Sequence, residues 1–272
     1  MDSILLTRDV MLSKVDSPHD RIYYSSNEEL DALFSSISIE NKKVLSVLGS
    51  SEQVFHLYNK NPLLVDTFDI NQLAQFYYYL RRWSIVYLDN YCPNVFSNEE
   101  IKKIISYVQP CDDLEKKALA YWESYLLHFS SYFTKYLFFM GTNSKRNKID
   151  DLKRIREYIK NCPFSFKCMD ILKEKIPKKY NFIYLSNISE YYHSSNDMNA
   201  IVSNVCDMLE DDGEVLTTNI LNNHVSFYER DSFSKDFLRR QIYYKDDIIG
   251  NHYKRREKVL TKNSWHLFLF LI

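Results

Sequence analysis

Two apolar runs, residues 44–48 and 63–68, constrain this chain more than any other feature, with about two turns of helix expected between them at 54–60. Each run has the length and residue types of a buried strand and ends in small or polar residues. Gly49 closes the first run, and Asp69 ends the second, 20 residues later. A tight turn after one strand and a carboxylate after the next are typical of a βαβ unit that binds a nucleotide.

The turn after the first run carries one glycine and then hydroxyl and amide side chains: Gly49, Ser50, Ser51 and Gln53. A dinucleotide-binding turn has several glycines, which let backbone amides reach a pyrophosphate. The single glycine here favours a ligand without phosphates, such as the amino acid and sulfonium portion of S-adenosylmethionine. The alternative is an ordinary strand-to-helix turn that binds nothing.

Asp69 is the next candidate for a binding residue. A carboxylate at the end of an apolar strand costs free energy unless a hydrogen-bond partner compensates it. Ribose hydroxyls are one such partner, and we prefer them. The alternative is that Asp69 caps a helix by accepting from Leu73. Asp66 lies inside the same strand, where we expect it to make a structural hydrogen bond.

A third strand is expected at 164–169, and it ends at another acidic residue. Asp170 is placed to accept from the amino group of an adenine, with Met169 packing against the base. The alternative is that Asp170 only caps a helix that begins at Ile171.

Polar and aromatic residues follow the fourth expected strand, 181–185. Asn187 is a candidate to hold a substrate heteroatom or the cofactor's amino acid portion. Glu190 or His193 could serve as general base, and Tyr191 or Tyr192 could contact a sulfonium or position a nucleophile. A solvated loop with one buried tyrosine is the alternative. The histidines show no H-x-x-x-H spacing, so we expect no metal.

The order of these elements predicts an α/β protein with a doubly wound sheet and a helical insertion after the second strand. The domain boundaries are expected at 1–71 for the lead-in and first βαβ unit, 72–161 for the insertion, and 162–272 for the rest of the binding domain. We prefer a cap over the ligand for the insertion, with a dimer interface as the alternative. Other expected elements are a longest helix that begins at 112 or 113 and is broken at Gly141, a helix at 197–209, a strand at 214–220, a helix at 232–241, and edge strands at 258–261 and 265–272.

Charge and composition narrow the partners. The net charge is −1, which predicts no nucleic-acid partner. Basic clusters at 81–82, 239–240 and 254–256 are expected to be solvated faces; the alternative is attraction of an anionic substrate or lipid head group. Five cysteines without a C-x-x-C pair, together with no signal peptide and no membrane span, predict a cytoplasmic protein. Peripheral contact with a membrane and a homodimer both stay open.

Four segments together resemble one family: 24–28, 44–53, 65–71 and 183–187. They are similar to the S-adenosylmethionine:diacylglycerol 3-amino-3-carboxypropyltransferases, which make the precursor of the betaine-lipid head group and have a class I methyltransferase-like (Rossmann-like) fold. The family turn usually has a second glycine and an aspartate where this chain has Ser51 and Glu52. The resemblance covers roughly residues 22–90 and 164–220.

The resemblance implies S-adenosylmethionine as co-substrate and extends the expected cofactor-binding set. That set is Tyr24, Asn27, Gly49, Ser50, Ser51, Gln53, Asp69, Ile70, Asn71, Met169, Asp170, Ser186 and Asn187, and the expected catalytic residues are Asn187, Glu190 and Tyr192. The implied activity is transfer of the 3-amino-3-carboxypropyl group to an unidentified small molecule or lipid head group. A methyltransferase is the second hypothesis, and a protein that binds S-adenosylmethionine without turnover is the third.

Overall fold

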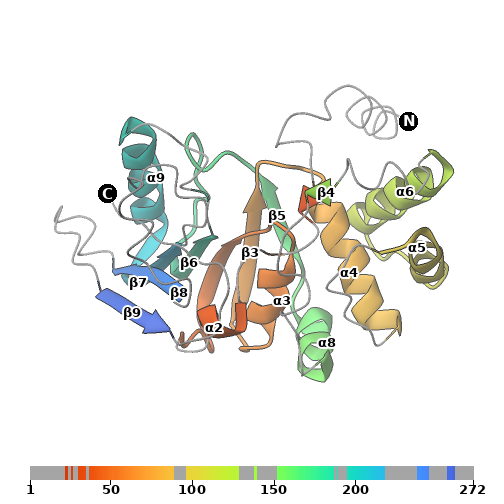
Figure 1. Ribbon diagram of the computed structural model, residues 1–272, viewed down its shortest axis with the longest axis horizontal. Helices are drawn as coiled ribbons and strands as arrows, with labels where there is room; N and C mark the ends of the chain where they lie inside the picture. The colour runs from red at the N-terminus through yellow and green to blue at the C-terminus, as the bar shows by residue number, and fades with distance from the viewer. Residues whose placement is uncertain are drawn as a thin grey trace, which may run out of the picture. The chain divides into compact units, whose positions relative to one another are not determined.

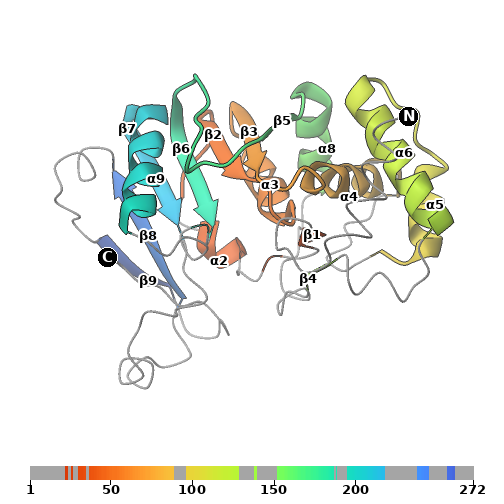
Figure 2. The ribbon, with the colours of Figure 1, turned by 90° about the horizontal axis from the view of Figure 1, so that it is seen from above.

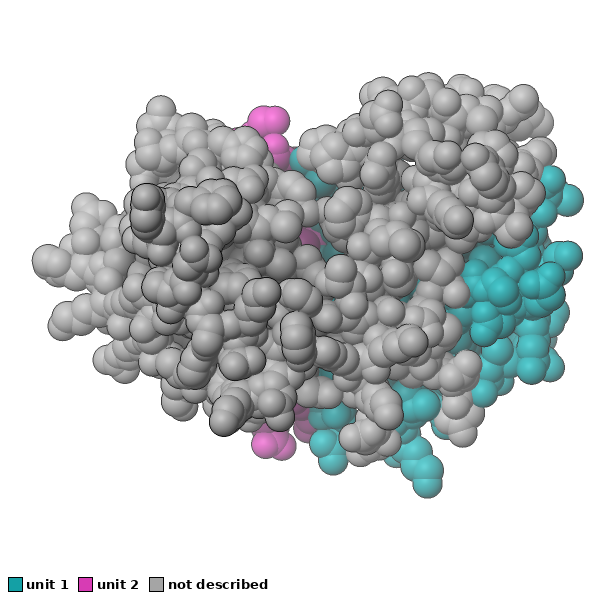
Figure 3. Space-filling view, viewed as in Figure 1, with its two compact units in different colours: residues 1–26, 48–59, 69–163 teal, residues 27–47, 60–68, 164–272 magenta. Residues whose placement is uncertain are grey.

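The structure is a computed structural model, and it describes residues 22–23, 26, 30–34, 37–88, 96–128, 138–139, 152–186, 188, 195–217, 238–244 and 256–260. The chain forms two compact units, shown in separate colours in Figure 3. We call residues 1–26, 48–59 and 69–163 the helical unit, and residues 27–47, 60–68 and 164–272 the sheet unit.

The sheet unit contains a seven-stranded sheet in the order β5-β3-β2-β6-β7-β8-β9. Its strands are β2 (Lys43–Val47), β3 (Leu64–Asp69), β5 (Ser165–Cys168), β6 (Tyr180–Ser186), β7 (Leu209–Thr217), β8 (Leu238–Tyr244) and β9 (Arg256–Leu260). The central pairs β3–β2, β2–β6 and β6–β7 are parallel, as Figure 2 lets the reader follow. Numbered in chain order within this sheet, β2, β3, β5, β6 and β7 are strands 1 to 5. They lie side by side in the order 3-2-1-4-5, which is the order of a Rossmann-like sheet. The predicted fold class is confirmed.

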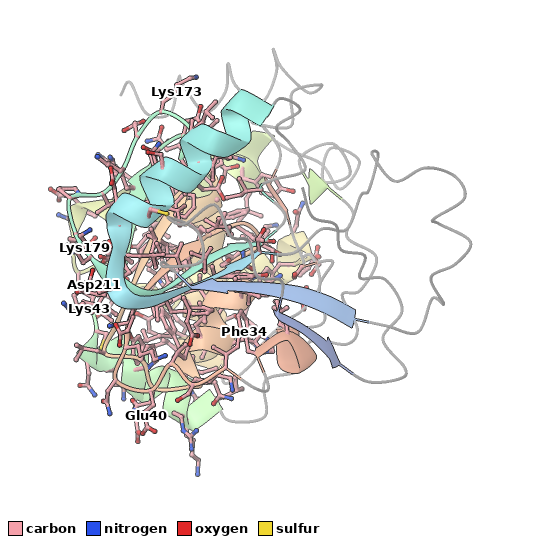
Figure 4. The ribbon with its side chains drawn as sticks, turned by 90° about the vertical axis from the view of Figure 1, so that its left-hand side faces the viewer. Phe34, Glu40, Lys43, Lys173, Lys179 and Asp211 are labelled. Atoms are coloured by element: carbon pink, nitrogen blue, oxygen red, sulfur yellow. The ribbon has the colours of Figure 1, made fainter. Side chains whose placement is uncertain are left out.

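The strand order reverses between β2 and β6, and both of these neighbouring strands are buried. Val44 and Leu45 of β2 are fully buried, as are Phe182 and Ile183 of β6. Such near-continuous burial is typical of parallel strands covered on both faces. The short helix α2 (Leu30–Phe34) adds to this core, because Phe34, labelled in Figure 4, meets the ring of Tyr184 edge-on at 5.2 Å between centroids.

The predicted helix at 232–241 is wrong where the structure describes it. Residues 238–241 belong to β8, which pairs antiparallel with β7 from Glu214↔Tyr244 to Thr217↔Gln241. The pattern of a short segment does not separate helix from strand. Pairing within the sheet determines the conformation here, because the backbone groups along the edge of β7 form hydrogen bonds with β8.

The helical unit holds α3 (Glu52–Tyr58), α4 (Ala74–Leu88), α5 (Asn98–Ile105), α6 (Asp113–His128) and α8 (Leu152–Asn161). Figure 1 shows α5 and α6 beside α4, and a capping box between Ser97 and Glu100 begins α5. The longest helix is shorter than predicted: α6 ends at His128, and residues 138–139 form the strand β4, which pairs with β1 (Ile22–Tyr23). Along the chain, α4, α5, α6 and α8 thus lie between β3 and β5, as the predicted insertion requires.

Aromatic side chains form the core of the helical unit. The hydroxyls of Tyr58 and Tyr78 lie 3.0 Å apart, Phe55 stacks on Tyr78, and Tyr58 stacks on Tyr158 at 4.5 Å between centroids. Burial raises the pKa of Tyr78 to about 12, so its phenol stays neutral at ordinary pH and shares a neutral hydrogen bond. Among the described residues, none of the helices is long and apolar enough to cross a bilayer.

Candidate functional site

The candidate site begins at a tightly wound turn between β2 and α3, residues 48–53, which we call the Gly49 turn. Gly49 has φ +47° and Ser51 has φ +64°, so two of its residues adopt left-handed backbone conformations. The amide of Ser51 donates to the carbonyl of Leu48 at 2.6 Å and closes the turn. Glycine adopts this conformation freely, but serine does so at a cost, and such strain persists only where the surroundings hold it.

Asp69 reaches this turn from the end of the neighbouring strand. Its Oδ2 accepts the amide of Gly49 at 2.8 Å, and its Oδ1 accepts the amide of Asn71 at 2.9 Å. The expected alternative for Asp69, capping Leu73, is made instead by Asn71, whose Oδ1 accepts the Leu73 amide at 2.9 Å. The structure thus brings Gly49, Asp69 and Asn71 together, as the sequence predicts.

Gln53 folds back over the turn. Its Nε2 donates to the carbonyl of Leu48 at 2.8 Å, and its Oε1 accepts from the hydroxyl of Ser50 at 3.3 Å. A Cβ added at Gly49 would lie 2.6 Å from Gln53 Nε2, so this side chain would have to shift, and the φ of +47° already favours glycine here. Ser50 and Gln53, both expected to contact a cofactor, thus also hold the shape of the turn.

One residue of the turn, Glu52, forms a buried ion pair that the sequence did not reveal. Glu52 Oε1 and Arg81 Nη2 are 3.6 Å apart, and both side chains are 0% exposed. The other oxygen of Glu52 accepts the backbone amide of Ser26 at 2.6 Å, and the guanidinium of Arg81 lies 4.9 Å from the ring centre of Tyr77. The prediction that residues 81–82 form a solvated face is wrong for Arg81. Charged side chains are almost never fully buried unless paired, and the partner is 29 residues away in the chain.

Arg82, the next residue, faces a different partner. Its guanidinium pairs with Glu115 of α6 and lies 5.7 Å from the ring centre of Tyr79. Glu115 also accepts the backbone amide of Cys111 at 2.9 Å. Burial alone would lower the pKa of Arg82. The acidic groups around it, among them Tyr78 and Glu115, have a larger effect in the opposite direction, so its pKa is raised and the guanidinium stays charged. This side chain is only partly buried, which makes it a useful comparison for Arg81.

The sheet unit holds three further residues of the expected cofactor set. Met169 is buried, and Asp170 accepts the backbone amide of Leu172 at 3.0 Å and pairs with Lys173, labelled in Figure 4. Asp170 therefore caps the turn that follows it, which is the local role weighed as its alternative. Ser186 has a left-handed φ of +52° and accepts the hydroxyl of Thr217 at 2.9 Å. Their contacts with a cofactor stay predictions.

Asp66 makes the structural hydrogen bonds expected of it. Its Oδ2 accepts the phenol of Tyr180 at 2.8 Å and the ammonium of Lys178 at 2.9 Å. Burial raises the pKa of Asp66, but hydrogen bonds from Lys178, Ser165 and Tyr180 outweigh it and hold the pKa below its usual range. The partners of Asp66 are thus side chains around β6, whereas those of Asp69, three residues later, include backbone amides at the Gly49 turn.

The remaining expected site residues, Tyr24, Asn27, Asn187, Glu190 and Tyr192, lie outside the described residues. Their roles stay predictions. In the part of the chain that the structure describes, no group of three histidine, cysteine, aspartate or glutamate side chains has a geometry that could hold a metal ion.

Comparison with solved structures finds S-adenosylmethionine-related methyltransferases at low similarity. The glycopeptide N-methyltransferase MtfA complexed with S-adenosyl-L-methionine is 10% identical, with a TM-score of 0.39 over 84% of this chain and 69% of that one. The N-methyltransferase NodS from Bradyrhizobium japonicum WM9 is 10% identical, with a TM-score of 0.31 over 80% and 72% of the two chains. A TehB-like methyltransferase from Corynebacterium glutamicum is 7% identical, with a TM-score of 0.35 over 78% and 73%.

The match to MtfA complexed with sinefungin spans 61% of the MtfA chain. No model of a known protein family matches this chain, and no curated protein sequence matches it.

Proposed function

We propose that this protein is an S-adenosylmethionine-dependent transferase whose cofactor binds at the Gly49 turn. The observation that carries the proposal is the carboxylate of Asp69, which the amides of Gly49 and Asn71 hold beside the turn. A ribose offers two neighbouring hydroxyl donors, and an acidic residue at the end of the second strand accepts them in nucleotide-binding βαβ units. The turn itself, with one glycine and a folded-back glutamine, suits a nucleoside ligand without phosphates.

Ile70 supports a ligand whose ribose lies at Asp69 and whose adenine lies beside it. It follows Asp69 directly and is 42% exposed, although isoleucine is among the residues most often buried. An adenine attached to a ribose at Asp69 could pack its face against this side chain and remove apolar surface from water. Asp170 and Met169 are the further candidates for contacts with the base.

The group transferred is proposed to be the 3-amino-3-carboxypropyl group. An acceptor atom would attack the γ-carbon of the methionine moiety, the bond from that carbon to sulfur would break, and the sulfur would keep the electron pair in methylthioadenosine. The acceptor's proton would pass to a base, for which Glu190 is the candidate, with Asn187 and Tyr192 orienting the reactants. The resemblance to the aminocarboxypropyltransferases supports this choice, and a small molecule or lipid head group is the acceptor class it implies.

A methyltransferase is the second candidate, because the same sulfonium can lose its methyl carbon to the acceptor and leave S-adenosylhomocysteine. The binding residues are the same for both reactions, so the choice depends on which carbon the pocket presents to the acceptor. A protein that binds the cofactor without turnover is the third candidate.

One experiment separates the three. The purified protein is incubated with S-adenosylmethionine and with diacylglycerol in mixed micelles or a panel of small amines and alcohols, and the nucleoside products are identified by mass spectrometry. Methylthioadenosine above the rate of spontaneous breakdown supports aminocarboxypropyl transfer, and S-adenosylhomocysteine supports methyl transfer. Binding without either product supports the third candidate, and absence of binding contradicts the whole proposal.

A further inference from the structure

The buried pair of Glu52 and Arg81 sits where three segments of the helical unit meet. Glu52 is the first residue of α3 and follows Ser51, the residue with the strained left-handed backbone. Its carboxylate accepts the Ser26 amide from the N-terminal segment and pairs with Arg81 of α4. One side chain therefore joins the end of the Gly49 turn to two segments that are distant in sequence.

A buried ion pair is weak evidence for a role in stability alone. Desolvating a carboxylate and a guanidinium is costly, and apolar residues of similar volume often serve the fold as well or better. The separation of 3.6 Å is also longer than a strong charge-assisted hydrogen bond. Such a pair is better explained where it fixes one particular local arrangement.

The arrangement it fixes is the backbone at Ser51. That residue is 0% exposed with φ +64° and ψ −8°, and its hydroxyl donates to the carbonyl of Ser50 at 2.5 Å. A serine holds this conformation only when its neighbours leave no alternative. Glu52 is attached to it covalently, accepts the Ser26 amide at Oε2 and faces Arg81 at Oε1, and it supplies that constraint from the helix side.

We propose that Glu52 and Arg81 are positioning residues of the Gly49 turn, which hold Ser51 and the amides around it in the geometry that receives the ligand. This inference rests on the proposed function, since the ligand is taken to be S-adenosylmethionine. Neither side chain contacts the ligand; both act through the turn.

The test compares two ion pairs on the same helix. Glu52→Gln and Arg81→Met each break the pair at the turn, whereas the matched control Glu115→Gln breaks the pair that Arg82 makes with α6. Each variant is checked for folding by circular dichroism, and its affinity for S-adenosylmethionine is measured by titration calorimetry. We expect the first two to bind at least tenfold more weakly, and the control to stay within twofold of the wild type.

Folded Glu52→Gln and Arg81→Met variants that bind within twofold of the wild type would overturn the inference, as would an equal loss in Glu115→Gln. If the single variants do not fold, the double variant Glu52→Gln/Arg81→Met leaves no uncompensated charge. The same tenfold loss then supports the inference, and wild-type affinity overturns it.

Failure of the proposed function is distinguishable from failure of this inference. If the wild type does not bind S-adenosylmethionine, hydrogen exchange of the Ser26 amide still reports on the positioning contact. Glu52→Ala should speed that exchange at least tenfold, with Glu115→Ala unchanged, because Glu52 accepts the Ser26 amide at 2.6 Å. Unchanged exchange in Glu52→Ala would overturn the inference without reference to any ligand.

Discussion

Replacing Asp69 with asparagine tests the proposed ribose contact most directly. Both carboxylate oxygens accept backbone amides, from Gly49 and Asn71, so either orientation of an asparagine amide turns its NH₂ group toward one of these donors. One hydrogen bond is therefore lost in the free protein, which should lower the free energy of unfolding by about 1–3 kcal/mol. Asp69→Ala would lose both bonds and disturb the turn more.

The same substitution should also weaken the binding of S-adenosylmethionine, and by more than this loss of stability alone would do in a protein that stays folded. A hydrogen bond to a charged acceptor contributes about 1.5–3 kcal/mol, and asparagine replaces the charge with an amide that already faces the backbone. At about 1.4 kcal/mol for each factor of ten, the dissociation constant for S-adenosylmethionine should rise roughly 10- to 150-fold.

The assay is titration calorimetry with S-adenosylmethionine, accompanied by chemical denaturation of the same sample. Asp66→Asn is the matched control: it makes the same substitution three residues earlier in β3, where the carboxylate is engaged by Tyr180 and Lys178. It should lower stability and leave the affinity of the folded protein within twofold. An Asp69→Asn protein that is folded and binds as tightly as the wild type would refute the ribose assignment.

Three further predictions concern stability. The pKa of Asp66 is depressed in the folded state, so its contribution to the free energy of unfolding should be present above about pH 4 and be lost as the pH falls through the folded pKa. Asp66→Asn should therefore flatten the acid side of a plot of the free energy of unfolding against pH. Gly49→Ala should destabilise by about 1 kcal/mol or more, because alanine is strained at φ +47° and its Cβ would displace the Gln53 side chain, whereas Ser51→Gly should stabilise by up to about 1 kcal/mol. Equal effects of the two substitutions in urea denaturation would contradict the backbone argument. Tyr78→Phe removes one hydroxyl of the buried Tyr58–Tyr78 pair and should cost about 1 kcal/mol in the same assay, and no loss would show that the bond contributes nothing.

The first βαβ unit was predictable because its signals are local. Five- or six-residue apolar runs, one glycine in a chain with four, and an acidic residue after the second run fix β2, the turn and β3 within a few residues. The segment at 232–241 was not predictable in the same way. Its pattern fits a helix, but residues 238–241 belong to β8, which pairs with β7 through 241–244 and with β9 through 238–242, and pairing with distant strands overrides local preference.

The candidate site divides along the same line. Gly49 and Asp69 were found from spacing, since residues that end adjacent parallel strands meet at one edge of the sheet. No local pattern marks Glu52, and because adjacent arginines are usually exposed, the sequence predicts a solvated Arg81. Only the packing of α4 shows that one of them is buried, and no pattern in the sequence marks a partner 29 residues away.

The two arginines show how the insertion is bound to the turn. Successive residues on a helix point about 100° apart, so Arg81 and Arg82 leave α4 in different directions. Arg81 pairs with Glu52 at the start of α3, and Arg82 pairs with Glu115 in the first turn of α6. Helix α4 therefore carries one ion pair to the Gly49 turn and a second to the rest of the insertion. The two pairs differ in burial, since Arg81 and Glu52 are both 0% exposed, whereas Arg82 is 22% and Glu115 6% exposed. We therefore expect the fully buried pair to constrain the turn, and the partly exposed pair to connect helices and to be broken at lower cost.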